Sequence, residues 1–151
     1  MMTMHYPPFD IRMKTVGGNR LIFDNIRKIW LKLTPEEWVR QNFVLYLTEV
    51  MKYPSSLIAL EKKIMVGELM RRFDILIYDP DFRPWMLVEC KAMEIPLTPS
   101  VLDQVLRYNI SVPVAYLVIT NGNYCMPFKK ANGTLEIMED LPLFGEKAGN
   151  L

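Results

Sequence analysis

The stretch Met70–Ala92, MRRFDILIYDPDFRPWMLVECKA, decides the fold of this 151-residue chain. It contains two apolar runs, FDILIYD and WMLVECKA, joined by a connection that holds Pro80 and Pro84. Apolar runs of this length around a proline-containing turn are typical of two neighbouring antiparallel strands. We therefore predict a strand pair at the centre of the fold.

Asp74 lies at the start of the first run, and Glu89 and Lys91 lie at the end of the second. Side chains alternate along a strand, so Glu89 and Lys91 share one face and Cys90 points to the other. A carboxylate inside an apolar strand is costly to desolvate unless a partner compensates its charge. The partners on offer are the other charged groups or a metal ion. Two carboxylates with a backbone carbonyl and water suit Mg²⁺, which points to phosphoryl chemistry.

Asp74 followed by Glu89-Cys90-Lys91 resembles the D…ExK signature of the PD-(D/E)xK nucleases. Gln104 and Tyr108 match the QxxxY pair that many exonuclease-like members carry on the helix after the ExK strand. Five segments look like the N-terminal nuclease domain of Type I restriction-enzyme R subunits: TPEEWVRQ (34–41), RRFDILIYD (71–79), LVECKA (87–92), QVLRYN (104–109) and VITNG (118–122).

The resemblance implies hydrolysis of a DNA phosphodiester that leaves a 5′ phosphate. Asp74, Glu89 and the main-chain carbonyl of Cys90 are then expected to hold Mg²⁺ or Mn²⁺. Lys91 is expected to orient the attacking water and to offset negative charge on the phosphate. The resemblance also implies that Gln104 and Tyr108, on the following helix, bind water or a phosphate oxygen.

Members of this family usually carry an acidic residue on the first helix that faces the metal, and Glu37 or Glu36 is the candidate here. A structural role competes with this one. Thr34, Pro35 and Glu37 make a capping box, in which a glutamate stabilises the helix start by ~1 kcal/mol without any catalysis. Both interpretations of Glu37 stay open at this point.

Positive charge is not in excess over the whole chain, because 18 Lys and Arg residues face 17 Asp and Glu residues. Any DNA contact must therefore come from a local basic face or from a partner subunit. The densest basic region is Lys62, Lys63, Arg71 and Arg72. Arg71 and Arg72 directly precede Asp74 and are candidates for phosphate contact, and Arg107 is a further one. A solvated strand edge protected by lysines is the alternative.

The order of the predicted elements defines the fold class. We predict an irregular arm or at most a short strand (1–20), extended structure (21–33), a helix (34–51) and three strands (57–66, 73–79 and 85–92). A helix that opens at Thr98, in a segment closed by Pro113, a strand (114–120), two further strands (124–128 and 135–138) and a tail (139–151) follow. The segment 21–33 also fits a short helix. The succession αβββαβ predicts one α/β domain with the restriction-endonuclease-like core, a mixed sheet flanked by helices and extra C-terminal strands.

Several other classes of protein are excluded. His5 is the only histidine, so neither a Ser-His-Asp or Cys-His site nor a histidine-metal nuclease can be built. Cys90 and Cys125 lie in apolar runs without CxxC spacing, so we expect buried free thiols in a reducing interior. The N-terminus has no apolar signal region, and no apolar run reaches the ~18 residues that cross a bilayer. A cytoplasmic location without membrane contact is expected.

The phosphate-binding GxxxxGK[ST] loop of a translocating motor does not occur in the sequence. We therefore expect DNA as the partner, with motor or specificity subunits supplied in trans. A non-catalytic module of the same fold that binds nucleic acid or protein is the competing hypothesis.

Overall fold

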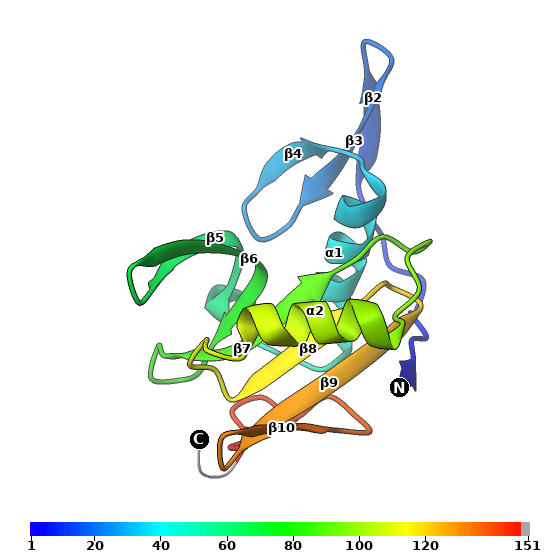
Figure 1. Ribbon diagram of the computed structural model, residues 1–151. Helices are drawn as coiled ribbons and strands as arrows, with labels where there is room; N and C mark the ends of the chain where they lie inside the picture. Colours follow the sequence, from blue (N-terminus) through cyan, green and yellow to red (C-terminus); the bar gives the residue numbers. More distant parts are fainter. Residues whose placement is uncertain (149–151) are drawn as a thin grey trace.

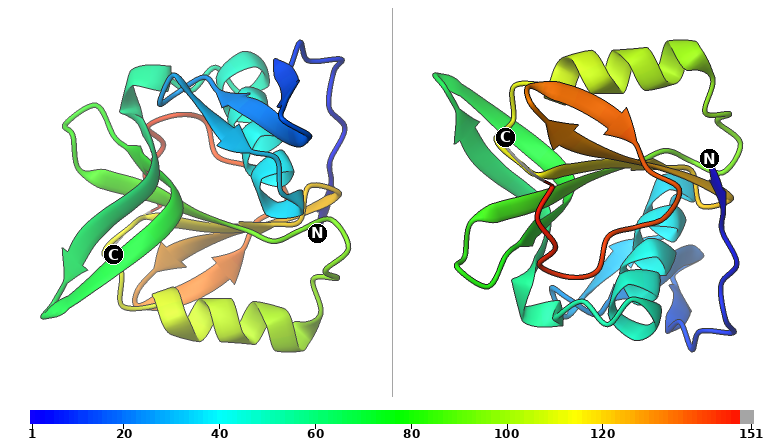
Figure 2. Two further views of the ribbon diagram at one scale, coloured as in Figure 1. Left: turned by 90° about the horizontal axis from the view of Figure 1, so that it is seen from above. Right: turned by 90° about the horizontal axis from the view of Figure 1, so that it is seen from below.

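The central strands of the sheet carry apolar side chains on both faces, because a helix covers each face. Alternate residues of β6 (Leu69–Tyr78), β7 (Pro84–Cys90) and β8 (Tyr116–Thr120) belong to different core clusters. One set packs with α1 (Pro35–Leu45) and the other with α2 (Pro99–Asn109). The computed structural model, which describes residues 1–148, places the two helices on opposite sides of the sheet (Figures 1 and 2).

The main sheet has seven strands of mixed direction, in the order β1-β9-β8-β7-β6-β5 with β10 paired to β9. The strands not yet located are β1 (Met2–Thr3), β5 (Ile58–Val66), β9 (Tyr124–Ala131) and β10 (Thr134–Ile137). Strands β7 and β8 are parallel and α2 connects them, whereas the other neighbouring pairs are antiparallel. From residue 35 to residue 120 the elements follow one another in the predicted order, as α1, β5, β6, β7, α2 and β8.

Both α-helices begin where local sequence signals predict. The hydroxyl of Thr34 accepts a hydrogen bond from the backbone N–H of Glu37, and Thr98 does the same for Val101. A proline follows each threonine in the first helical turn, where its missing N–H costs nothing. Helix α1 continues as a π-helical turn, Tyr46–Val50, and a 3₁₀ turn, Ser55–Leu57, precedes β5.

A second, antiparallel sheet precedes α1 and consists of β2 (Met13–Val16), β3 (Asn19–Asp24) and β4 (Ile29–Lys32). We call it the small sheet. It confirms the extended interpretation of residues 21–33. It also corrects the prediction for residues 1–20, which are not an irregular arm but contain β1, β2 and the start of β3. Gly17 and Gly18, with φ of 56° and 81°, form the two-residue turn between β2 and β3.

The segment from residue 139 to residue 148 contains no helix or strand, as predicted for the tail. Phe144 nevertheless packs against the rings of Tyr53 and Trp85, and the indole N–H of Trp85 donates to the carbonyl of Glu146 at 2.9 Å. Leu143, beside it, is exposed. The rest of the predicted tail, residues 149–151, lies outside the described residues.

Both cysteines are buried and free, as predicted. Among residues 1–148, no helix combines the length and the apolar character that crossing a membrane requires.

Candidate active site

Asp74 lies where the β5–β6 hairpin departs from the main sheet. Residues 75–78 of β6 pair with β7, whereas residues 69–73 pair with β5. The free part of the hairpin projects from the body of the protein (Figures 1 and 2). Because β6 leaves β7 at this residue, the Asp74 carboxylate can turn toward the end of β7 instead of following the ladder.

The three residues of the predicted signature meet at this point. The N–H of Cys90 donates to Oδ2 of Asp74 at 2.8 Å, which holds the carboxylate against the residue between Glu89 and Lys91. Burial raises the pKa of Glu89 to about 8, and the charge of Asp74 and a hydrogen bond to it act in the same direction. The ammonium group of Lys91 opposes this shift. Asp74 and Glu89 thus form an interacting carboxyl pair, and the charge of Lys91 acts on it although no carboxylate of the described residues lies within 4.0 Å of the Lys91 ammonium group.

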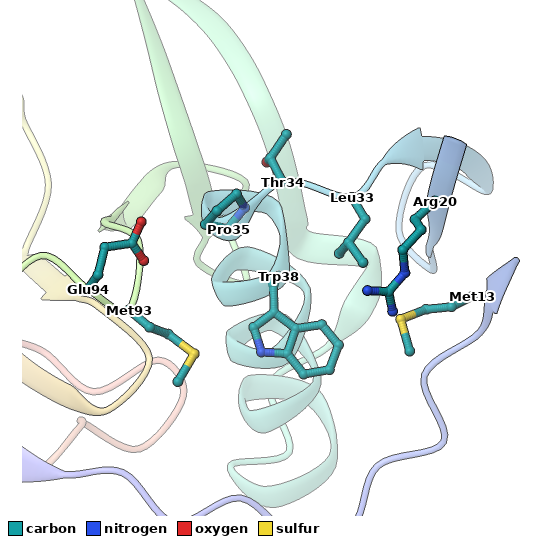
Figure 3. Close-up of a pocket in the computed structure, with 8 residues that line it drawn as sticks. All are labelled: Met13, Arg20, Leu33, Thr34, Pro35, Trp38, Met93 and Glu94. Atoms are coloured by element: carbon teal, nitrogen blue, oxygen red, sulfur yellow. The ribbon is translucent and has the colours of Figure 1, made fainter. Parts of the chain in front are cut away.

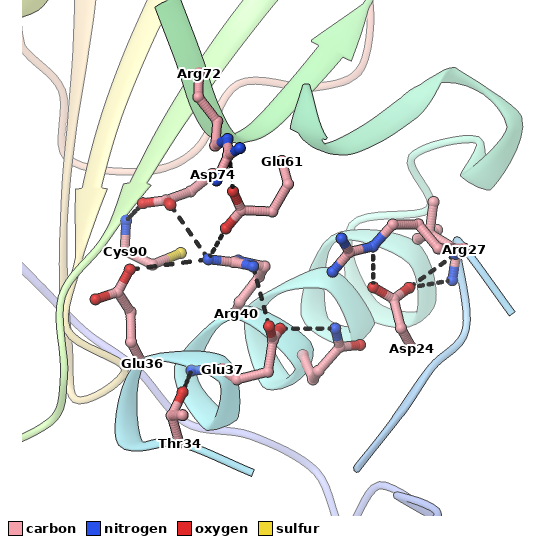
Figure 4. A network of polar contacts seen from close by, with 12 residues as sticks. Asp24, Arg27, Thr34, Glu36, Glu37, Arg40, Glu61, Arg72, Asp74 and Cys90 are labelled. Atoms are coloured by element: carbon pink, nitrogen blue, oxygen red, sulfur yellow. Dashed lines mark hydrogen bonds and ion pairs between the residues drawn. The ribbon is translucent and has the colours of Figure 1, made fainter. Parts of the chain in front are cut away.

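A buried arginine that we did not predict, Arg40, lies among the acidic side chains around the site. The guanidinium of Arg40, on α1, lies 3.0 Å from Glu37, 2.5 Å from Glu61 and 3.3 Å from Asp74 (Figure 4). Glu36 is farther away, at 3.8 Å. Burial disfavours the charged form of Arg40, but the three nearer carboxylates outweigh it, so the pKa of Arg40 is raised. Arg40 therefore stays charged and joins α1, β5 and β6 through one group.

Glu61 has a backbone conformation that is unusual for a strand. Its φ is 52°, in the left-handed region, although it is not a glycine and lies within β5. The flanking pairs Leu60–Ile75 and Lys62–Phe73 keep register, so Glu61 stands opposite Asp74 without pairing to it. Such strain costs of order 1–3 kcal/mol and persists only where surrounding contacts impose it. Here the contact is the ion pair with Arg40.

The two acids at the start of α1 have different surroundings. Glu37 is buried and its carboxylate bonds Arg40 and the side chain of Gln41 at 3.0 Å each, so the capping box lacks its reciprocal half. Glu36 is more exposed. Burial raises the pKa of Glu36, Asp74 adds to the rise, and Arg40 and Lys91 oppose it. Of the two candidates, Glu36 thus shares the electrostatic environment of the signature residues.

The predicted residues of α2 lie on the surface of the protein. Gln104 is exposed, and Tyr108 has 56% of its surface exposed. The guanidinium of Arg71 stacks over the Tyr108 ring, 3.8 Å from its centroid, and also bonds the Tyr108 carbonyl. Within residues 1–148, neither Gln104 nor Tyr108 has a hydrogen bond to Asp74 or Glu89.

The predicted phosphate contacts are already engaged with the protein. Arg71 binds Tyr108, and Arg72 lies 3.5 Å from Glu61. Arg107 is exposed and pairs with Asp103 at 2.9 Å. Because each of these contacts leaves other N–H groups of the guanidinium unused, the three arginines can still donate to a phosphate, and Lys62 and Lys63 of β5 are exposed.

A depression of about 500 Å³ opens in front of the arginine-centred cluster. Its lining includes Glu36, Glu37, Arg40 and Glu61. In the described part of the chain, no group of three His, Cys, Asp or Glu side chains is arranged as a metal site. The site predicted from the sequence uses only two side chains, Asp74 and Glu89, with a carbonyl. These hard oxygen donors suit Mg²⁺, which binds through one or two carboxylates and keeps several waters.

Part of the cluster around Arg40 could have been predicted from the sequence. Arg40 follows Glu36 and Glu37 by four and three residues, a spacing that brings side chains together on one helix face. Its contact with Asp74 spans 34 positions and has no local signal. Glu61 was visible only as one acid in a basic strand, and nothing in the sequence marks its positive φ.

Replacing Arg40 tests its place at the centre of the acids. We expect Arg40→Ala to lower the free energy of unfolding by about 3–5 kcal/mol, because buried carboxylates lose their counter-charge. The loss should be smaller at pH 5 than at pH 8, since protonation relieves the remaining repulsion. Urea denaturation at both pH values measures it. Arg107→Ala, which removes an exposed pair, should cost less than about 1 kcal/mol, and equal losses would contradict the central role of Arg40.

The pKa of Glu89 predicts a stabilising substitution. The folded state keeps a proton on Glu89 up to about pH 8, whereas the unfolded chain loses it near pH 4.5. The wild type therefore loses stability as pH rises through this window, and Glu89→Gln does not. In EDTA we expect Glu89→Gln to be more stable by about 1–3 kcal/mol at pH 8, with little difference at pH 5. Thermal unfolding, with the exposed Glu94→Gln as control, measures this; a destabilised Glu89→Gln at pH 8 refutes it.

Comparison with known proteins identifies the family. The sequence model described as Type I restriction enzyme R protein N terminus (HSDR_N) matches residues 35–142, more than two thirds of the chain. The match starts at α1 and includes Asp74, Glu89 and Lys91, whereas the small sheet lies outside it. No curated protein matches the chain. The chain therefore belongs to the family of Type I restriction enzyme R protein N-terminal domains.

Proposed function

We propose that this chain is a PD-(D/E)xK nuclease that hydrolyses DNA phosphodiester bonds with Mg²⁺ or Mn²⁺, and that α1 to β8 form a restriction-endonuclease-like core. Membership of the Type I restriction R-protein family supports a restriction-related role. The observation that carries the proposal is the 2.8 Å bond from the Cys90 N–H to Asp74. It holds an acid of β6 against the centre of the Glu89-Cys90-Lys91 motif.

The residues of the site would divide the work as follows. Asp74, Glu89 and the carbonyl of Cys90 would supply hard oxygen ligands. When bound, the metal ion would polarise the scissile phosphate and lower the pKa of a coordinated water. The Lys91 ammonium would orient the attacking water and offset the negative charge that develops on the phosphate oxygens. Glu36 would act from the helix side, in the place that the resemblance assigns to an acid of the first helix.

Arg40 would keep the acids in position before DNA and metal arrive. In the present structure its guanidinium shares Asp74 with the Cys90 amide. A carboxylate has about four acceptor positions, so these two bonds leave room for a further ligand on Asp74. Arg71 and Tyr108 would form part of a rim for DNA phosphates.

A non-catalytic binding module on the same fold is the second candidate. The pairing of Arg40 with Asp74, Glu37 and Glu61 favours it, because these acids already have a protein counter-charge. In that case the carboxylates stabilise the fold and no metal is required. The two candidates differ in their response to divalent cations.

Metal titration separates the two candidates. For a nuclease site, millimolar Mg²⁺ or Mn²⁺ should raise the melting temperature of the wild type, because a ligand that binds only the folded state stabilises it. The shift should disappear in Asp74→Ala and in Glu89→Ala and persist in the control Glu139→Ala, at an exposed glutamate outside the site. An unchanged wild-type melting temperature would favour the binding module.

Cleavage of DNA tests the proposal directly. Wild type and Lys91→Ala are compared on linear, nicked and single-stranded DNA with Mg²⁺ or Mn²⁺. We expect Lys91→Ala to lose at least about a hundredfold in rate, the typical effect of removing a charge-stabilising group. Lys52→Ala, at an exposed lysine outside the site, should cleave like the wild type. Equal cleavage by Lys91→Ala and wild type would exclude this site as the source of activity.

A further inference from the structure

The positive charge of the chain is concentrated before α1. Six of the 18 Lys and Arg residues lie between Ile11 and Leu33, but only one of the 17 acids, Asp24. This segment, which forms the small sheet, therefore has a formal charge of +5, and the rest of the chain has −4. The near-zero charge of the whole chain conceals this separation.

Cations of the small sheet are mostly unpaired. Asp24 is buried and binds Arg27 at 2.7 Å, which neutralises one of the six. Within the described residues, the other five have no carboxylate within 4.0 Å: Arg12, Lys14, Arg20, Lys28 and Lys32. By contrast, four arginines of the main body have carboxylate partners: Arg40, Arg72, Arg83 and Arg107. The small sheet thus retains its positive field.

The strand register places several of these cations on one face. Lys14 is opposite Leu21, which is opposite Lys32, and the next row on the same side is Arg12, Phe23 and Trp30. We call this set the basic sheet face: Arg12, Lys14, Leu21, Phe23, Trp30 and Lys32. It contains no acidic residue.

The other face of the small sheet turns toward the protein. Ile22 is completely buried, and Met13, Arg20 and Leu33 line a cavity of about 440 Å³ against Trp38 of α1 (Figure 3). The basic sheet face, on the opposite side, carries exposed Arg12, Lys14 and Lys32. The molecule therefore presents a flat positive surface without a covering element.

Aromatic rings hold two of the cations in place. The Arg12 guanidinium lies 4.4 Å from the centroid of Phe23, and the Lys14 ammonium lies 4.1 Å from that of Trp30. Cations fixed in this way lose less side-chain entropy when they bind an anion. Because the rings are half-buried under the cations, they are poorly placed to stack on unpaired bases. This geometry favours contact with phosphates.

The acidic site lies next to the small sheet. Strand β4 ends two residues before Thr34, the N-cap of α1. The cavity beside the small sheet and the depression at the acidic site share Thr34, Pro35 and Glu94. Four carboxylates of that site, those of Glu36, Glu37, Glu61 and Asp74, outnumber the positive charges of Arg40 and Lys91, so it repels a polyanion. Cations on an adjoining surface would compensate this repulsion.

We propose that the basic sheet face binds the phosphate backbone of duplex DNA without sequence preference. The inference takes its substrate class from the proposed function but does not require cleavage. Duplex DNA carries one negative charge per about 1.7 Å of helix axis, so a three-cation face can engage it in many registers. The family match begins at residue 35, so this surface lies outside the region that defines the family.

The test is binding of a fluorescent 25-base-pair duplex, measured by anisotropy in EDTA between 50 and 200 mM NaCl. Lys14→Glu/Lys32→Glu should weaken binding by at least about tenfold and reduce the slope of log K against log salt by about two. Lys14→Arg/Lys32→Arg should bind like the wild type. The matched control Lys52→Glu/Lys147→Glu makes the same charge change at exposed lysines elsewhere and should retain most of the affinity.

Three outcomes would overturn the proposal. They are wild-type affinity in Lys14→Glu/Lys32→Glu, an equal loss in the matched control, and tighter binding to single-stranded than to duplex DNA. If the charge-reversed variant does not fold by circular dichroism, Lys14→Gln/Lys32→Gln replaces it with the same expected change in slope. Binding that persists without cleavage would refute only the nuclease proposal, and cleavage with unchanged binding by the sheet variants would refute only this one.

Discussion

The geometry of the candidate site depends on one buried guanidinium. Arg40 would be too costly to bury alone, and the acids around it would repel one another without it. Because its partners come from α1, β5 and β6, the group fixes the helix against the root of the hairpin. The Arg40 Nε has no hydrogen-bond partner among the described residues, so the two terminal nitrogens of the guanidinium make all of its contacts with the carboxylates. Displacing Arg40 would release Asp74 and Glu61 together.

Sequence reasoning predicted what local chemistry determines. Thr34 and Thr98 mark helix starts because caps act within three residues, and the run of residues 70–92 forms strands because both faces are buried. Features determined by tertiary contacts could not be predicted from the sequence. The positive φ of Glu61 depends on an ion pair across the fold, and the position of Tyr108 depends on how α2 is rotated about its axis. The small sheet was ambiguous because strands of four to six residues show few periods.

Acidic residues and unpaired basic residues lie in different parts of the molecule. This explains why the composition alone did not indicate a positively charged surface. Acids gather where β5, β6, β7 and α1 meet, and their cation is buried among them. Unpaired cations lie on the small sheet, whose inner face buries Ile22 and whose outer face combines lysine and arginine with aromatic rings. The net charge of +1 is the sum of +5 for residues 11–33 and −4 for the rest of the chain. Only the strand register shows which of the cations act together.

The small sheet is attached to the body at both ends. Before it, Met2 pairs with Cys125 and the N–H of Met4 donates to the carbonyl of Asn123; after it, β4 leads into α1. The Gly17–Gly18 turn at its far end stands in open space, because a Cβ atom added to either glycine would meet no described neighbour within 4 Å. A protease cut at this turn would therefore leave two fragments that remain associated through the ladder of β2 and β3. The same turn is a suitable place to insert a peptide tag or a fluorophore.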